Sequence, residues 1–198
     1  MKKLLLASNN PDKATEVRDL LADLHITLAL LNEFPQFPPT IEDAETLEGN
    51  ALKKATEAYR RTGLPTIADD TGLEVHYLND QPGVYSSRFA GPNASYADNC
   101  AKLLRLLRGV PPRRRAARFR CVIAFVPDEH THHCVEGICR GVIVESPRGT
   151  GGFGYDPLFL PDGHTQTFGE MDLALKNTLS HRAHALIALK SYLRSIGW

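Results

Sequence analysis

The sequence predicts an α/β protein with a mixed β-sheet. Short apolar runs alternate with amphipathic helical segments, a pattern typical of strands joined by helices. Residues 118–126 and 134–144 are two long strand candidates separated only by a polar loop, so they predict a hairpin and antiparallel pairing. The chain has no internal repeat and no low-complexity linker. We therefore expect residues 1–198 to form a single domain.

The N-terminal segments predict a strand, a helix and a second strand. Residues 3–7 are apolar enough for a buried strand. Asn10 suits an N-cap and Pro11 suits the first helical position, so a helix is expected over residues 12–24. Residues 27–31 predict the second strand.

The next segments lead to a pair of acids. The proline-rich stretch 34–39 predicts a loop, and residues 46–61 predict a helix with small apolar residues on one side. Residues 66–68 predict a strand that ends in a turn at 69–72, and residues 73–78 predict a further strand.

The remaining segments complete the expected fold. Residues 81–93 predict a loop and residues 96–107 a helix. Residues 149–156 form a glycine-rich loop, and Ser180 is placed to cap a last helix that runs to about residue 194.

The composition excludes several classes of partner. Lys+Arg and Asp+Glu both number 23, so the zero net charge predicts binding to neither nucleic acid nor anionic membrane. The apolar N-terminal stretch is too short for a signal peptide, and no later run could span a bilayer. The four cysteines include no Cys-x-x-Cys pair, which favours free thiols in a reducing cytoplasm.

Two adjacent carboxylates, Asp69 and Asp70, follow a short apolar run and precede Thr71 and Gly72. Carboxylates at a strand end are suited to holding Mg²⁺ and to accepting a proton from water. The alternative is structural, because Asp, Thr and Gly are also ordinary turn residues.

Residues 8–13 lie between a predicted strand and a helix, where free backbone N–H groups can bind phosphate. Ser8 and Asn10 add hydrogen-bonding groups. Lys13 opposes the helix dipole, so a bound anion would explain it better than helix stability does. A capped helix with a surface lysine is the alternative.

The glycine-rich loop 149–157 holds Phe153 and Tyr155, whose rings could stack on a planar base. A mobile loop is the alternative. Further along, Lys176 precedes His181 and Arg182 at a helix start, and the planar donors of arginine suit carbonyl or phosphate oxygens.

Other charged segments carry weaker evidence. The acids at 42–45 precede a helix, where the dipole favours them without any metal. Asn50 and Lys54 share a helix face. The histidines at 130–133 lack a second ligand pair with zinc spacing, and the arginines at 113–115 are typical of a solvated turn.

Taken together, five motifs resemble the inosine triphosphate pyrophosphatase family, the Ham1-type hydrolases of noncanonical purine nucleotides. The motifs occur in the family's order and span nearly the whole chain: residues 8–13, 46–51, 68–72, 151–157 and 180–182. The resemblance implies a long mixed sheet with helices that form two lobes around a central cleft, usually in a homodimer. It also implies Mg²⁺-dependent hydrolysis of ITP, dITP and XTP to the monophosphate and pyrophosphate, which cleanses the nucleotide pool.

The resemblance also implies roles for individual residues. Glu42 and Asp70 would bind Mg²⁺, and Asp70 would be the catalytic base. The substrate would be bound by Ser8, Asn9, Asn10, Pro11, Asp12, Lys13, Lys54, Thr71, Phe153, Gly154, Tyr155, Asp156, Lys176, His181 and Arg182. Asp69 would be a supporting ligand or a turn residue.

The sequence departs from the family pattern at two positions. Asn9 stands where many members have glycine, and asparagine tolerates left-handed backbone better than most residues. Gly49 stands where many members have an acid, which leaves Glu48 as the nearer carboxylate.

Hydrogen-bond polarity suggests how the base is selected. Arg182 has only donors, so it would donate a hydrogen bond to the 6-oxo group of inosine or xanthine and would not pair with the 6-amino donor of adenine. Two other functions remain open: a related Maf-type pyrophosphatase acting on dTTP or UTP, and a nucleotide-binding sensor without catalysis. The glycine-aromatic loop argues against the first, and acids beside a phosphate site argue against the second.

Overall fold

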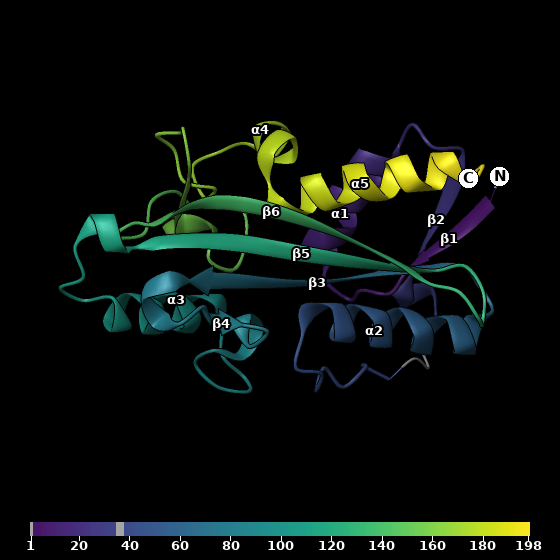
Figure 1. Cartoon of the computed structure of the whole chain (residues 1–198), viewed down its shortest axis with the longest axis horizontal. Coiled ribbons are helices and arrows are strands. Elements are labelled where there is room, and N and C mark those ends of the chain that lie inside the picture. Colours follow the sequence, from purple (N-terminus) through teal and green to yellow (C-terminus); the bar gives the residue numbers. More distant parts are fainter. Residues whose placement is uncertain (1, 35–37) are drawn as a thin grey trace. The chain divides into compact units, whose positions relative to one another are not determined.

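The computed structural model describes residues 2–34 and 38–198 (Figure 1). Its strands are β1 (Lys2–Leu6), β2 (Ile26–Leu30), β3 (Thr66–Val75), β4 (Gln81–Gly83), β5 (Ala116–Val126), β6 (His133–Ile143) and β7 (Phe159–Pro161). Its α-helices are α1 (Pro11–Leu21), α2 (Leu47–Thr62), α3 (Tyr96–Leu106), α4 (Leu173–Leu179) and α5 (His181–Ser195).

The strands form a mixed sheet. Hydrogen-bonded neighbours follow the order β2-β1-β3-β5-β6-β7, and β4 pairs with β3 off this path. β1 pairs in parallel with β2 and β3, whereas the β3–β4 and β6–β7 pairs are antiparallel. The predicted α/β class with a mixed sheet is therefore confirmed, and the two segments of the predicted hairpin, β5 and β6, are neighbours.

The chain divides into two compact units. The first comprises the described residues of segments 1–70, 121–137 and 182–198, and the second comprises segments 71–120 and 138–181. Each unit has a hydrophobic core of its own, the first between β-strands and helices α1 and α5, the second around the rings of Phe119, Phe159 and Phe168. Within the first unit, α2 covers the face of the strands opposite α5 (Figure 1).

Local sequence explains how the two helices nearest the predicted site begin. The Asn10 side chain accepts hydrogen bonds from the backbone N–H groups of Asp12 and Lys13, and Pro11 occupies the first turn of α1. Thr46 caps α2 by accepting a hydrogen bond from the Gly49 N–H. The predicted Asn10 cap is thus confirmed, whereas α2 begins at Leu47, one residue later than predicted, with Thr46 as its cap.

The acids Asp69 and Asp70 lie inside a strand, so the predicted turn at 69–72 is wrong. β3 runs without interruption from Thr66 to Val75. Successive side chains of a strand point to opposite faces, so each acid can be buried among its own partners without a turn. The strand predicted at 73–78 is also shorter than expected, because residues 76–78 form a single 3-10 turn.

Other differences concern short elements and ends. The predicted loop 81–93 contains β4, and α1 ends at Leu21 rather than residue 24. β7 and α4 were not predicted, because their lengths of 3 and 7 residues give little periodicity to read. Of the loop predicted at 34–39, residues 35–37 lie outside the described residues. In the part of the chain that the structure describes, no helix is long and apolar enough to cross a membrane.

Candidate active site

The segment between β1 and α1 presents the predicted phosphate-binding residues at the start of a helix. Asn9, Pro11 and Asp12 are exposed, and the Ser8 hydroxyl accepts a hydrogen bond from the Asn10 N–H at 3.2 Å. The Asn10 side chain caps the Asp12 and Lys13 N–H groups, so this end of α1 offers an anion the positive end of the helix dipole and the Lys13 ammonium.

Lys54 of α2 brings together the two predicted metal ligands. Its Nζ lies 2.8 Å from Glu42 Oε1 and 3.0 Å from Asp70 Oδ1. The Asn50 amide donates to the other Asp70 oxygen at 3.3 Å and also accepts from the Ala44 N–H at 3.0 Å. Asn50 thereby ties the loop that carries Glu42 to the end of the β3 segment that carries Asp70.

The charges around Asp70 are unbalanced. Two carboxylates, Glu42 and Asp70, share one cation, Lys54. Burial raises the pKa of Asp70, and Glu42 adds to that rise while Lys54 opposes it. Burial would lower the pKa of Lys54, but Asp70 and Glu42 outweigh it and raise that pKa. The set carries an excess negative charge that a further cation would neutralise.

The donor set at Asp70 fits Mg²⁺. The oxygens of Glu42 and Asp70 converge on one cation, the Lys54 ammonium, which stands where positive charge is favoured. Among the residues that the structure describes, no group of three or more His, Cys, Asp or Glu side chains could hold a metal ion. Mg²⁺ is commonly held by one or two carboxylates together with water and substrate phosphates, so a pair of acids is sufficient.

Asp69 faces a different set of partners. Its Oδ2 lies 2.9 Å from Lys13 Nζ and accepts hydrogen bonds from Arg182 Nε at 3.2 Å and Arg182 NH2 at 3.1 Å. Burial would raise the pKa of Asp69, but the charges of Lys13 and Arg182 outweigh it and lower that pKa. Since Asp69 lies within β3, it is not a turn residue.

Arg182 is held by two carboxylates. Besides its contacts with Asp69, its NH1 group lies 2.5 Å from Oε2 of Glu16 on α1. Burial would lower the pKa of Arg182, but Asp69 and Glu16 raise it. Sequence analysis missed Glu16. Its position three residues after Lys13 on the same helix was the available signal, because residues at that spacing share a helix face.

The second unit contains the predicted residues of the glycine-rich loop. Lys176 Nζ lies 2.9 Å from Asp156 Oδ2 and 4.6 Å from the centre of the Phe153 ring. The same Asp156 oxygen accepts a hydrogen bond from the Phe153 N–H at 2.8 Å. Gly152 has a φ of 68°, and a Cβ there would lie 2.1 Å from Asp156 Oδ2, so the loop requires glycine at this position.

The aromatic residues of the second unit differ in exposure. Phe153 is half-buried, whereas Tyr155 is buried and donates its hydroxyl to the Ser86 carbonyl at 2.9 Å. The ring of His181 stacks on Phe119 with centroids 4.5 Å apart. Thr71, the first residue of this unit, is half-buried in β3. Of the two loop rings, Phe153 is therefore the more accessible to a base.

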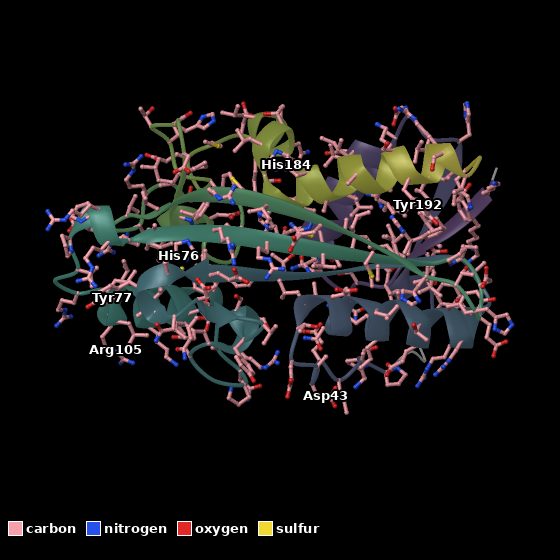
Figure 2. All side chains as sticks on the ribbon, in the orientation of Figure 1. Asp43, His76, Tyr77, Arg105, His184 and Tyr192 are labelled. Carbon is pink, nitrogen blue, oxygen red and sulfur yellow. The ribbon has the colours of Figure 1, made fainter. Side chains whose placement is uncertain are left out.

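Two further acids near the start of α2, Asp43 and Glu48, are exposed. Asp43, on the loop preceding α2 (Figure 2), pairs at 2.6 Å with Lys53 and is largely exposed. Glu48 is also exposed. A Cβ at Gly49 would lie 2.9 Å from the Ala44 Cβ, so an acid at position 49 would require the loop to shift.

Comparisons with known proteins agree on one family. The model of the Ham1 family matches residues 4–192. A dITP/XTP pyrophosphatase of Geobacter sulfurreducens is 48% identical over 198 residues, covering 100% of this chain and 98% of the relative. One from Desulforamulus reducens is 49% identical over 184 residues, covering 93% and 92%. The structure of a HAM1 protein from Coxiella burnetii superposes with a TM-score of 0.90 at 41% identity, covering 98% of this chain and 100% of that one.

Proposed function

The chain belongs to the Ham1 family, and from this premise we propose that it hydrolyses the noncanonical purine nucleotides ITP, dITP and XTP to the monophosphate and pyrophosphate, with Mg²⁺ as its cofactor. This activity would remove such nucleotides from the cellular pool. The relatives in Geobacter sulfurreducens and Desulforamulus reducens are dITP/XTP pyrophosphatases, which confirms the predicted enzyme class, a hydrolase of acid anhydrides.

The arrangement of Glu42, Lys54 and Asp70 carries the proposal. The Lys54 ammonium lies 2.8 Å from Glu42 and 3.0 Å from Asp70, at the end of the β3 segment in the first unit. A site that only bound an anion would gain nothing from this excess of negative charge. The excess suits a metal that accompanies a triphosphate, together with a base for water.

Asp70 is the proposed base. Its Oδ1 and Oδ2 accept hydrogen bonds from Lys54 and Asn50, which fix the orientation of the carboxylate. When bound, Mg²⁺ would neutralise phosphate oxygens and lower the pKa of a coordinated water. Asp70 would accept the proton of the water that attacks the α-phosphorus.

Residues 8–13 and Lys54 are proposed to hold the triphosphate. The Asp12 and Lys13 N–H groups, which Asn10 caps, would exchange this acceptor for phosphate oxygens. Lys13 is paired with Asp69, so the triphosphate would compete for its ammonium group. Lys13 and Lys54 would then stabilise the negative charge that develops on the leaving pyrophosphate.

The base is proposed to bind to Phe153, Gly154, Tyr155, Asp156, Lys176, His181 and Arg182. Arg182 donates only, so it suits the 6-oxo group of inosine and xanthine. The 6-amino donor of adenine would instead face the guanidinium donors of Arg182. Such a buried mismatch makes the binding free energy less favourable by roughly 1–3 kcal/mol. Thr71 would contact the substrate from β3. We also propose that the protein acts as a homodimer in the cytoplasm.

Pyrophosphate release with Mg²⁺ tests the proposal across ITP, XTP, dTTP, UTP and ATP. We expect kcat/KM for ITP and XTP to exceed that for ATP by at least about fivefold, from the buried mismatch alone. A preference for dTTP or UTP would instead indicate a Maf-type pyrophosphatase. Nucleotide binding without any pyrophosphate release would indicate a sensor.

A further inference from the structure

A buried carboxylate on α1 holds the arginine that is proposed to select the base. Glu16 is 2% exposed and Arg182 is 1% exposed, and their closest atoms are 2.5 Å apart. The two residues are 166 positions apart in the chain, and both belong to the first unit. The pair therefore links α1 to the first turn of α5.

Packing alone does not explain Glu16. Its neighbours on α1, Ala14 and Val17, are buried apolar residues that pack against α5 in the core of the first unit. An apolar side chain at position 16 would extend that packing, and replacing buried ion pairs by well-packed apolar residues is often neutral or stabilising. A buried carboxylate at this position consequently points to a role in which its charge and direction matter.

The contacts fix the plane of the guanidinium group. Glu16 accepts from NH1, whereas Asp69 accepts from Nε and NH2 on a different edge. Arginine presents its donors in a rigid planar fork, so carboxylates on two edges fix the direction of the whole group. Loss of the Glu16 charge would weaken the contact at NH1 and leave those of Nε and NH2 with Asp69.

The same cluster reaches the residue proposed to bind the triphosphate. Asp69 Oδ2 contacts both Lys13 Nζ at 2.9 Å and Arg182 NH2 at 3.1 Å. Glu16, by contrast, has its 2.5 Å contact with Arg182. Removing the Glu16 charge should therefore disturb Arg182 first, while the Asp69–Lys13 contact persists.

We propose that Glu16 is a positioning residue, which orients Arg182 for recognition of the purine base. This inference rests on the proposed role of Arg182 in base binding. If so, a change at Glu16 should alter the affinity for the base and leave the affinity for the triphosphate unchanged.

Binding in EDTA tests the inference without turnover. Isothermal titration calorimetry would compare ITP with inorganic tripolyphosphate, which lacks the base, for the wild type and Glu16→Gln. We expect Glu16→Gln to weaken ITP binding by about tenfold, the effect of one impaired buried hydrogen bond, and to change tripolyphosphate binding by less than about twofold. Asp19→Asn is the matched control, because Asp19 is an exposed acid on the same helix, and it should leave both affinities unchanged.

Two results would overturn the inference: an unchanged ITP affinity in Glu16→Gln, or an equal loss for ITP and tripolyphosphate, which a general structural role would produce. If Glu16→Gln does not fold, the double variant Glu16→Gln/Arg182→Gln removes both buried charges and is compared with Arg182→Gln. The two should bind ITP equally, because Glu16 acts through Arg182; a further tenfold loss in the double variant contradicts this. Failure of the proposed function would show separately, as a wild type that does not hydrolyse ITP with Mg²⁺.

Discussion

Asp69 and Asp70 are adjacent in β3 but lie in opposite electrostatic surroundings. Asp69 belongs to a balanced cluster in which two cations, Lys13 and Arg182, meet two carboxylates, Asp69 and Glu16. Asp70 belongs to an unbalanced one, in which it shares Lys54 with Glu42. Exposure hardly separates the two acids, at 3% and 7%. Their partners do, because the strand directs one acid toward α1 and α5 and the other toward α2.

The opposite pKa shifts of Asp69 and Asp70 indicate which of the two can act as a base or a metal ligand. Burial alone would raise both pKa values, yet the pKa of Asp69 is lowered by its two cations while that of Asp70 stays raised. A carboxylate whose pKa is lowered by neighbouring cations is a poor base and stabilises the fold. A carboxylate with a raised pKa and excess negative charge nearby can accept a cation or a proton.

The largest expected effect is the loss of activity in Asp70→Asn. Removing a general base costs about 10³-fold in kcat, within the usual range for such groups. The fold should persist, because Lys54 keeps its 2.8 Å contact with Glu42. Steady-state pyrophosphate release from ITP measures the loss, and the unfolding midpoint in urea checks the fold. Retention of near wild-type kcat would show that another group takes the proton.

The second effect is a loss of stability in Asp69→Asn. This change removes the negative charge that Lys13 and Arg182 both contact, so buried positive charge loses a counter-charge. Removing one partner of a buried pair typically costs about 3 kcal/mol or more of unfolding free energy. Urea denaturation in EDTA measures it, with Asp43→Asn as an exposed control. A loss in Asp69→Asn no greater than in this control would contradict the assignment of the two clusters.

The sequence predicts the elements that carry this site better than it predicts the partners. The Asn10 cap is a local feature whose side chain bonds to backbone within three residues, so the start of α1 could be predicted directly. The start of α2 was predicted to within one residue, at the Thr46 cap. The family resemblance rests on motifs that are also local. Both are properties of short stretches of chain.

The partners of Asp69 and Asp70 could not be read in that way. Arg182 meets Asp69 across 113 positions, and no short motif encodes such a contact. The turn prediction was wrong for a related reason. Two adjacent acids are unfavourable inside a strand unless each has cations on its own face of the sheet, and the sequence does not show those cations. Glu16 was missed because an acid on a largely apolar helix face has no evident role until its arginine is known.

The third effect concerns metal binding. Mg²⁺ at about 100 times its dissociation constant should stabilise the wild type by about 2.7 kcal/mol, because it would bind the folded state only. Asp70→Asn should lose most of this gain, since one of the two proposed ligands is gone. Thermal unfolding with Mg²⁺ and with EDTA measures the difference for each protein. A stabilisation of equal size in Asp70→Asn would place the metal elsewhere.

The smallest effect is a pH dependence of stability. The pKa of Asp70 in the folded state lies above its ordinary value of 3.8, so ionised Asp70 lowers the free energy of unfolding at neutral pH. This destabilisation disappears once the pH falls below the pKa values of both the folded and the unfolded state. Asp70→Asn in EDTA should thus be more stable than the wild type at pH 7, and the two should converge in acid. Urea unfolding across this pH range measures the difference.

Asp69 gives the opposite sign in the same experiment. Its folded pKa is lowered, so its stabilising contribution is present above the ordinary value of 3.8 and is lost as the pH falls toward the folded pKa. The wild type should therefore exceed Asp69→Asn in stability at neutral pH, and this advantage should shrink in acid. If both variants were less stable than the wild type at pH 7, the attraction of Lys54 for ionised Asp70 would exceed the penalty of burying that charge. The two acids would then both stabilise the fold and differ only in how much.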